Sequence, residues 1–297
     1  MRWFAVFVAT LAVYTLAGKA SSEESIKTMA DVLAEASASD WRIPDPEMTL
    51  YLTLKSGTVV IELASEFAPS TVANIQRLMK AQYFDGLSIN RVQENYVVQL
   101  GDPQAEDDAA RPHGLPNTLE PEFFRPRSGL SFVELASDDA YADTVGFASG
   151  FPMGADKERA WLTHCYAMVG VGRGLPPDSG IGTELYVVTG HAPRHLDRNV
   201  TLVGRVLQGM ELLTTLPRGT GAFGFYEHES ERIPIESVRF ASDIPLSERL
   251  DLKVLRTNTP TFQNLIKSRQ FRTDNWFVDT AGRIGVCNVP IPVSENR

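Results

Sequence analysis

The sequence predicts a mainly β fold. Short segments in which apolar and polar residues alternate, separated by turn-forming residues, recur between residues 48 and 240, and a period of two is typical of half-buried strands. Fewer segments show the spacing of three and four residues that marks an amphipathic helix. The chain has 297 residues, 43% of them hydrophobic and 22% charged, which is enough for one or two domains with a substantial core.

The overall charge argues against one class of partner. The chain carries 28 Lys and Arg against 37 Asp and Glu, a net charge of −9, and its arginines are scattered rather than clustered. Binding to phosphate backbones needs a basic patch or stripe. We therefore expect no nucleic-acid partner.

Residues 1–20 are typical of a secretory signal peptide. Arg2 precedes the apolar run Trp3–Leu16, and small residues follow it. The run is shorter than the roughly 20 residues that span a bilayer. We expect a periplasmic or secreted protein without stable membrane insertion after cleavage. An uncleaved membrane anchor is the less favoured alternative.

Residues 21–47 are predicted to form an N-terminal helical arm and a linker. Helical spacing within residues 25–38 is carried by four apolar residues: Ile26, Met29, Val32 and Leu33. Pro44 and Pro46 favour irregular structure over residues 40–46. We expect Trp41 to pack this arm onto the domain that follows.

The main domain is predicted over residues 48–240, and it opens with a hairpin and a helix. Thr49–Leu54 and Thr58–Leu63 alternate around a Ser-Gly turn and are typical of paired strands. Pro69 marks a helix start, where its missing N–H costs nothing. The helix, expected to run to about residue 82, carries an apolar stripe made of Val72, Ile75, Leu78 and Met79.

The stretch Tyr83–Pro103 follows that helix and contains the first candidate site residues. A strand is predicted over Leu87–Val92, in which Ile89 and Arg91 share one face. A second strand, Tyr96–Leu100, places Val97 and Gln99 on one face. An arginine and a glutamine beside apolar residues are the make-up of a small-ligand pocket. A surface arginine closing a salt bridge on a hairpin fits this stretch equally well.

Two separate blocks of sequence resemble one known family. Residues 83–103, YFDGLSINRVQENYVVQLGDP, resemble the signature of the cyclophilin-type peptidyl-prolyl isomerases in the order and spacing of Phe-x-Asp-Gly, the arginine, the aromatic with two aliphatics, and the glutamine before Gly-Asp. Residues 182–189, GTELYVVT, with the following GHAPRHLDRNVTLVGRVLQGMELL, resemble its second half. The chain is identified as a member of this family.

The resemblance implies both a fold and an activity. The fold is a cyclophilin-like closed antiparallel barrel of eight strands capped by two helices, here with N- and C-terminal extensions. The activity is peptidyl-prolyl cis-trans isomerisation of Pro-containing polypeptides during the folding of exported proteins, with no metal and no cofactor. The alternative is a non-catalytic cyclophilin-like module that binds such segments in the manner of a chaperone.

The resemblance also implies the site residues. Arg91 matches the catalytic arginine and Gln99 the glutamine that helps to orient it. Val169 and Gly170 fall where the family's substrate-binding backbone strand runs. The proline-pocket positions are matched by Tyr96, Val97, Tyr186 and Leu196. Two further substrate-binding positions depart from the family: Glu184 replaces a Gln, and His195 replaces the Trp associated with cyclosporin binding, so we expect weak drug sensitivity.

Three other departures bear on activity. Val200 replaces a pocket His and removes a donor, and Leu100 replaces the first Gly of the family's Gly-Gly-Asp. Asn90 stands where a His often precedes the arginine, and we expect it to matter little because its side chain points to the other face. Arg91 is retained and the pocket remains apolar, so we expect activity that these departures reduce at most in part.

Residues 104–160 and 241–297 lie outside the compact family pattern. The first range is predicted to be a surface insertion with strands at Leu130–Leu135 and Thr144–Ala148. The second is predicted to be a C-terminal extension with a helix starting at Thr259-Pro260. We expect this extension to pack through three apolar residues: Trp276, Phe277 and Ile284.

Cys165 and Cys287 are the two cysteines of the chain. In an exported protein they could form a disulfide that ties the C-terminal segment to the core. Two isolated buried thiols fit the sequence equally well. No metal site is expected, because the cysteines lack metal-site spacing and Pro193 disrupts a helical pairing of His191 with His195.

Overall fold

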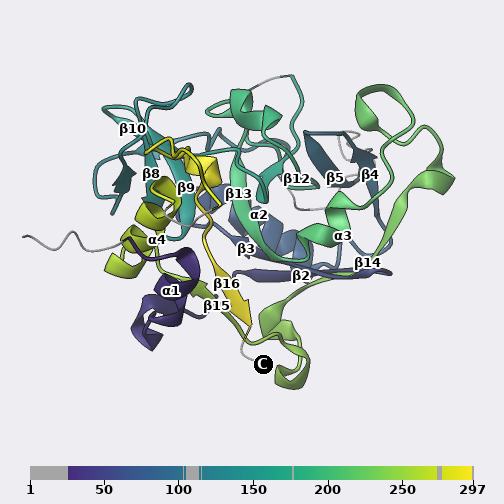
Figure 1. Cartoon of the computed structure of the whole chain (residues 1–297). Helices are drawn as coiled ribbons and strands as arrows, with labels where there is room; N and C mark the ends of the chain where they lie inside the picture. Colours follow the sequence, from purple (N-terminus) through teal and green to yellow (C-terminus); the bar gives the residue numbers. More distant parts are fainter. Residues whose placement is uncertain are drawn as a thin grey trace, which may run out of the picture.

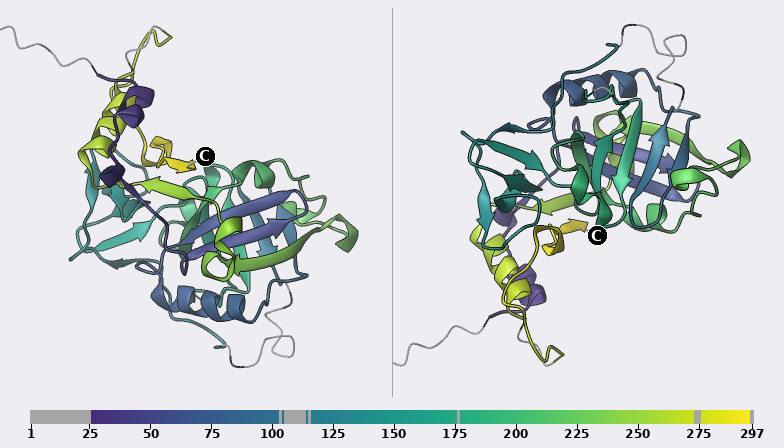
Figure 2. Two further views of the ribbon diagram at one scale, coloured as in Figure 1. Left: turned by 90° about the horizontal axis from the view of Figure 1, so that it is seen from below. Right: turned by 90° about the horizontal axis from the view of Figure 1, so that it is seen from above.

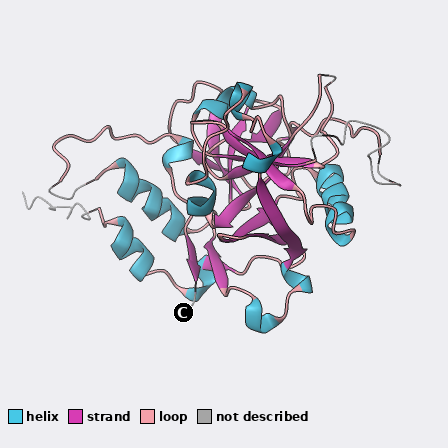
Figure 3. Ribbon diagram, turned by 90° about the vertical axis from the view of Figure 1, so that its right-hand side faces the viewer, coloured by secondary structure: helices cyan, strands magenta, loops and turns pink. Residues whose placement is uncertain are grey.

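The computed structural model describes residues 26–102, 104, 114, 116–175, 177–272 and 276–295. The predicted signal peptide and the acidic run at residues 106–108 lie outside these residues. Strands fill the middle of the molecule and helices lie at its edges (Figure 3). Within the described ranges, no helix is both long enough and apolar enough to cross a bilayer.

A closed barrel of eight antiparallel strands forms the larger part of the fold (Figure 1). Its strands are β2 (Thr49–Leu54), β3 (Gly57–Leu63), β4 (Ser88–Val92), β5 (Val97–Gly101), β11 (Met168–Val171), β12 (Glu184–Val188), β13 (Leu202–Gln208) and β14 (Ile233–Phe240). Around the barrel their order is β11-β12-β5-β4-β14-β2-β3-β13, and β13 pairs again with β11. The predicted mainly β fold with a closed antiparallel barrel of eight strands is confirmed.

Period-two alternation fills the barrel with aliphatic side chains. Leu50, Leu52 and Leu54 of β2 belong to one buried cluster with Val98 and Leu100 of β5. Two helices, α2 (Pro69–Lys80) and α3 (Met210–Thr214), contribute to the same cluster. The stripe predicted for the first helix is buried against this core, so α2 lies on the barrel as its sequence indicates.

A second core lies beside the barrel and is built from three distant parts of the chain (Figures 1 and 2). A five-stranded sheet has the order β6-β10-β9-β8-β7, and a three-stranded sheet has the order β1-β15-β16. Their bounds are β1 (Trp41–Arg42), β6 (Arg125–Pro126), β7 (Val133–Leu135), β8 (Thr144–Ala148), β9 (Phe151–Ala155), β10 (Arg159–Leu162), β15 (Leu252–Leu255) and β16 (Val293–Glu295). Helix α1 (Met29–Ala34) packs on α4 (Pro260–Gln270).

This second core changes three local expectations. The range predicted as a surface insertion supplies buried strands, with Val145 and Phe147 fully enclosed. Trp41 packs as expected, but it does so from the short strand β1, although irregular structure was predicted there. Ile284 is buried as predicted, whereas Trp276 is 80% exposed and meets the ring of Phe277 edge to face.

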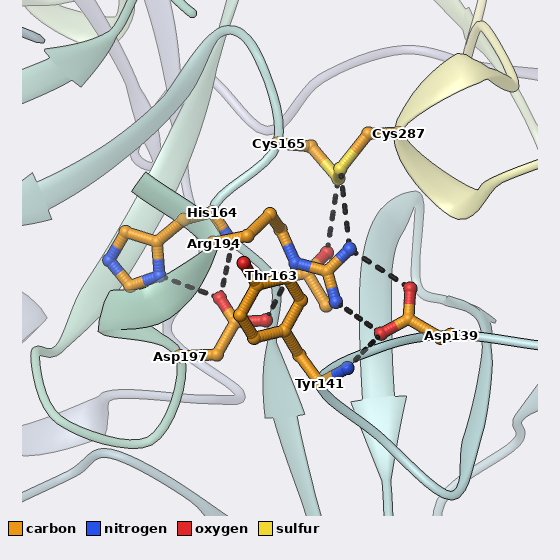
Figure 4. The surroundings of a disulfide bond; sticks show 8 residues. All are labelled: Asp139, Tyr141, Thr163, His164, Cys165, Arg194, Asp197 and Cys287. Carbon is orange, nitrogen blue, oxygen red and sulfur yellow. Dashed lines mark hydrogen bonds and ion pairs between the residues drawn. A yellow bond between two sulfur atoms is a disulfide. The ribbon is translucent and has the colours of Figure 1, made fainter. Parts of the chain in front are cut away.

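A disulfide between Cys165 and Cys287 joins the C-terminal segment to the barrel side of the molecule (Figure 4). Of the two alternatives left open by the sequence, the structure has the bonded pair. Closing a loop across 122 residues of sequence restricts the unfolded chain, and such a cross-link typically adds about 2–4 kcal/mol to stability. The bond therefore holds the C-terminal segment in place.

Candidate active site

The candidate site lies on the outer face of the barrel, where β4, β5, β11 and β12 run side by side. A register shift between Ile89 and Arg91 makes Asn90 an extra residue in β4. Ile89 therefore points into the barrel core while Arg91 lines a pocket outside it. The prediction that these two side chains share one face is wrong, because the bulge breaks the alternation. In β5 the predicted pairing of Val97 with Gln99 on one face is found.

Three hydrogen bonds hold the half-buried guanidinium of Arg91. Its Nε donates to the carbonyl of Phe223 at 2.8 Å, Nη1 donates to Oε1 of Gln99 at 3.2 Å, and Nη2 donates to Gln93. The rings of Tyr96 and Phe225 lie 5.5 and 5.0 Å from its central carbon. Burial lowers the pKa of Arg91, an effect that Tyr96 and Glu184 oppose, and an arginine so placed keeps its charge. A guanidinium has five N–H donors, and the described residues accept from three of them, so two remain for a substrate.

The pocket beside Arg91 is a hollow of about 460 Å³, within the range of small-ligand sites. Its lining consists of Arg91, Tyr96, Val97, Gln99, Val171, Gly172, Arg173, Glu184, Tyr186, Leu196, Val200 and Phe225. The lining includes seven of the ten residues predicted for the site. The hollow combines an aromatic and aliphatic floor with a few polar groups at its edge, which suits an apolar ring attached to a peptide backbone.

A chain of polar contacts runs along one edge of this hollow. The Nε2 amide of Gln99 donates to Oε1 of Glu184 at 3.1 Å, while its carbonyl accepts from Arg91. The amide of Asn90 lies 3.5 Å from the same Glu184 oxygen. Asn90 therefore faces the site through Glu184, and the expectation that it points elsewhere is wrong. The carboxylate puts a negative charge at the edge of the hollow opposite the arginine.

Beneath the floor, the hydroxyl of Tyr186 enters a fully buried polar chain. It lies 2.8 Å from Nε2 of His164, whose Nδ1 lies 2.9 Å from Oδ1 of Asp197. A carboxylate only accepts, so Nδ1 carries the imidazole proton and Nε2 accepts from the tyrosine. Burial lowers the pKa of His164 and raises that of Tyr186 well above its usual range. Both groups are therefore neutral at physiological pH, and the pocket ring is fixed from below.

This series of polar contacts continues from Asp197 to the second core through Arg194, as Figure 4 shows. Its Nε donates to Oδ2 of Asp197 at 2.8 Å, and its two terminal nitrogens bind the carboxylate of Asp139 at 3.1 and 2.7 Å. Nη1 also lies 3.8 Å from the sulfur of Cys287. Side chains from the barrel, the insertion and the C-terminal segment thus meet around one buried guanidinium.

Three predicted site residues lie outside the lining of the hollow. Val169 is buried in the barrel core. Gly170 lies behind Tyr186, and a Cβ at this position would sit 2.2 Å from the tyrosine ring. His195 stacks on Tyr96, with ring centroids 5.9 Å apart. Gly170 and His195 therefore touch the pocket aromatics from behind and from the side.

Four lining residues were not predicted from the sequence: Val171, Gly172, Arg173 and Phe225. Phe225 comes from the glycine-rich loop between α3 and β14, and a bridge pairs it with Arg91. A glycine-rich segment carries no periodic signal, so its path over the site could not be deduced. The other three directly follow the predicted Val169-Gly170 pair, and continuing that strand by three residues would have found them.

The sequence profile of the family described as "Cyclophilin type peptidyl-prolyl cis-trans isomerase/CLD" matches residues 49–240. The chain belongs to this family. Its closed eight-stranded barrel is accordingly that of a cyclophilin-type peptidyl-prolyl isomerase.

Relatives of this cyclophilin include both curated sequences and solved structures. A probable peptidyl-prolyl cis-trans isomerase of Brucella suis is 26% identical over 60% of this chain and 76% of its own length. A peptidyl-prolyl cis-trans isomerase-like 1 of Mus musculus is 24% identical over 69% of this chain and 94% of its own. The crystal structure of cyclophilin AquaCyp293 from Hirschia baltica has a TM-score of 0.68 and 26% identity, covering 91% of this chain and 97% of that one.

Proposed function

We propose that Arg91 is the catalytic residue of this cyclophilin and that Pro-containing polypeptides bind in the hollow beside it. The observation that carries the proposal is the state of the Arg91 guanidinium. It is half buried, fixed by three hydrogen bonds, and placed at the edge of an apolar hollow with two donors left over. In this arrangement the substrate's prolyl ring lies on the floor and its amide nitrogen faces the arginine.

The chemistry requires a donor that acts on the twisted amide. Resonance gives the X-Pro bond a rotational barrier of about 18–20 kcal/mol, and uncatalysed isomerisation takes roughly 10–100 s. When the amide twists, resonance is lost and the prolyl nitrogen recovers a lone pair. A donor fixed beside that nitrogen binds the transition state more strongly than either ground state, which is the condition for catalysis. The reaction needs no proton transfer and no broken bond.

The free energy of one charged hydrogen bond accounts for only part of the expected rate enhancement. A hydrogen bond from a charged group contributes about 1.5–3 kcal/mol, and about 1.4 kcal/mol corresponds to one decade of rate. Arg91 is therefore expected to supply about one to two decades. The apolar floor formed by Val97, Tyr186 and Leu196 supplies the rest by holding the prolyl ring in a place largely removed from water.

The other residues around the hollow have proposed roles in orienting Arg91 and in binding the substrate. Gln99 orients Arg91 through its carbonyl oxygen, and Tyr96 and His195 form a stacked wall beside the arginine. Val169 and Gly170 belong to β11, whose next residues form the wall along which a substrate backbone would run. Glu184 places a carboxylate where it would favour a basic side chain near the proline.

The proposed role is in the folding of exported proteins. Residues 1–20 have the composition of a signal peptide, residues 21–47 and 241–297 flank the isomerase domain, and the insertion lies at about 104–160. Cys165 and Cys287 form a disulfide, and such bonds persist mainly in oxidising compartments. Both observations support a periplasmic or secreted protein that acts on X-Pro bonds of exported chains.

The test compares the wild type with two variants by NMR exchange on a short Ala-Pro peptide. Arg91→Ala is expected to lose about one to two decades of the catalysed exchange rate. Arg77→Ala removes an exposed arginine of α2 and is expected to keep the wild-type rate. Equal rates in wild type, Arg91→Ala and buffer would instead leave a non-catalytic module that binds Pro-containing segments.

A further inference from the structure

A second cavity, separate from the candidate active site, lies between the barrel and the C-terminal segment. It measures about 640 Å³ and shares no lining residue with the hollow beside Arg91. One side is formed by residues 165–168 and by β13 of the barrel, the other by residues 286–293. The disulfide between Cys165 and Cys287 lies in its wall. The volume is within the range of about 300–1,000 Å³ typical of small-molecule sites.

Arg205 of β13 lines this cavity and is incompletely paired. The residue is 8% exposed, and its Nη1 makes a long contact of 3.4 Å to the carbonyl of Ile291. Its Nε and Nη2 are enclosed and have no hydrogen-bond partner among the described residues. Leaving charged donors buried and unpaired is costly. Burial lowers the pKa of Arg205 to about 10, so the group is still charged at physiological pH.

The carboxylate on the neighbouring strand does not satisfy this arginine. Glu62 stands opposite Arg205 in the pairing of β3 with β13. Both carboxylate oxygens of Glu62 bind Arg42, with Oε2 at 2.8 Å from Nη2. Two arginines thus surround a single carboxylate, and the group of three carries a net positive charge. An anion in the cavity would balance it.

Arg269, in the last turn of α4, brings a second guanidinium to the same cavity. Its Nε is also enclosed and without a hydrogen-bond partner in the part of the chain that the structure describes. Burial lowers the pKa of Arg269, and Arg272 acts in the same direction. No Asp or Glu is found among the described residues of the lining. The chain as a whole has a net charge of −9, so a cavity lined by two arginines and, among its described residues, by no acid differs in sign from the rest of the protein.

The remaining walls are largely apolar. They include Met168, Val206, Leu207, Val286, Val289 and Ile291. An inorganic anion would use the arginines and leave these walls in contact with water, whereas a neutral apolar molecule would bury both guanidinium groups unpaired. A carboxylate on a hydrocarbon body satisfies both parts of the cavity, because a planar carboxylate matches the fork of an arginine and the hydrocarbon covers the apolar walls.

We propose that this cavity is a binding site for a small amphipathic carboxylate, whose anionic group pairs with Arg205 and Arg269. The hydrocarbon body lies along the C-terminal segment. Entry of the carboxylate replaces the long contact between Arg205 and the Ile291 carbonyl and turns the guanidinium toward the ligand. The site is independent of the candidate active site and of the assignment of Arg91.

The test is calorimetric titration of the full-length, disulfide-bonded protein with decanoate below its micelle concentration. One decanoate is expected to bind per chain. Decanol, of the same length but neutral, and acetate, with the charge but no hydrocarbon body, are each expected to bind at least about tenfold more weakly, the effect of one lost charged hydrogen bond or of several buried CH₂ groups. Absence of saturable decanoate binding, or equal binding of decanol or acetate, would overturn the proposal.

Variants locate the site. Arg205→Gln and Arg269→Gln are each expected to weaken decanoate binding by about tenfold or more, while Arg77→Gln, an exposed matched change on α2, leaves it unaltered. Near-UV circular dichroism checks that each variant is folded. If Arg205→Gln does not fold, Arg269→Gln and the decanol comparison on the wild type still decide the question. Wild-type affinity in the folded arginine variants would contradict the assignment.

Discussion

The buried guanidinium of Arg194 offers the most quantitative test of how the second core supports the pocket. We consider Arg194→Met, which keeps much of the side-chain volume and removes the charge. Only 9% of the Arg194 side chain and 9% of the Asp139 side chain are exposed. The substitution leaves two carboxylates, those of Asp139 and Asp197, without their shared cation (Figure 4).

The expected loss of stability depends on how many hydrogen-bond donors each carboxylate keeps after the substitution. Removing one partner from a buried ion pair typically costs about 3–5 kcal/mol. Asp197 keeps two donors on Oδ1, the backbone N–H and the ring Nδ1 of His164, and Asp139 keeps the backbone N–H of Tyr141. These bonds offset part of the cost, so we expect the lower end, about 3 kcal/mol.

The assay is urea unfolding followed by fluorescence, with the disulfide intact. Arg283→Met is the matched control, because Arg283 pairs at 3.5 Å with Asp138, the neighbour of Asp139, and these side chains are 68% and 99% exposed. The control is expected to lose less than about 1 kcal/mol. Equal losses in the two variants, or a loss below about 1 kcal/mol for Arg194→Met, would refute the argument from burial.

Three further outcomes are expected. Gln99→Leu removes the acceptor for Nη1 of Arg91 and should lower kcat/KM about tenfold; an unchanged value would show that the arginine is oriented without it. Glu184→Gln should reduce the preference for peptides with Lys over Glu beside the proline by about fivefold, the effect of about 1 kcal/mol between charges near water, and an unaltered preference would place the flanking side chain elsewhere. Burial lowers the pKa of His164 from 6.5, so below that pH the unfolded chain binds a proton that the folded chain excludes, and stability falls as the pH decreases. Urea unfolding at several pH values should show this fall in the wild type and a smaller one in His164→Asn. The same dependence of the unfolding free energy on pH in both proteins would contradict the assignment.

Several strands and the first helix of the barrel could be predicted from the sequence because they obey simple rules, whereas the closure of eight strands into a barrel was implied by the family resemblance. Alternation in Thr49–Leu54 predicted the first hairpin, and the proline at position 69 predicted the start of the first helix. Both predictions lie close to the observed β2, β3 and α2. The second core could not be predicted in the same way. Its strands come from the insertion, and its helices and remaining strands come from the two ends of the chain. Each segment is short, and no local pattern says which distant segment will cover it.

The same distinction applies to the site. The strand pattern placed Val97 and Gln99 on one face, and the resemblance supplied Arg91 and the pocket aromatics that the structure brings together. Alternation failed at Asn90, because a bulge has no sequence signature of its own and shifts every later side chain to the other face. The role of His164 under Tyr186 was also missed, since nothing local indicates that Asp197 accepts from its ring.

The central claim is that a fixed guanidinium at position 91 stabilises the twisted amide more than it stabilises bound substrate. The most direct measurement is NMR line-shape analysis of an Ala-Pro peptide with wild type and Arg91→Lys, which yields the affinity and the on-enzyme exchange rate from the same spectra. Lysine keeps the charge and loses the rigid fork. We expect the exchange rate to fall by at least about tenfold while the affinity changes little. An exchange rate equal to that of the wild type, or a loss of affinity that accounts for the whole effect, would contradict the claim.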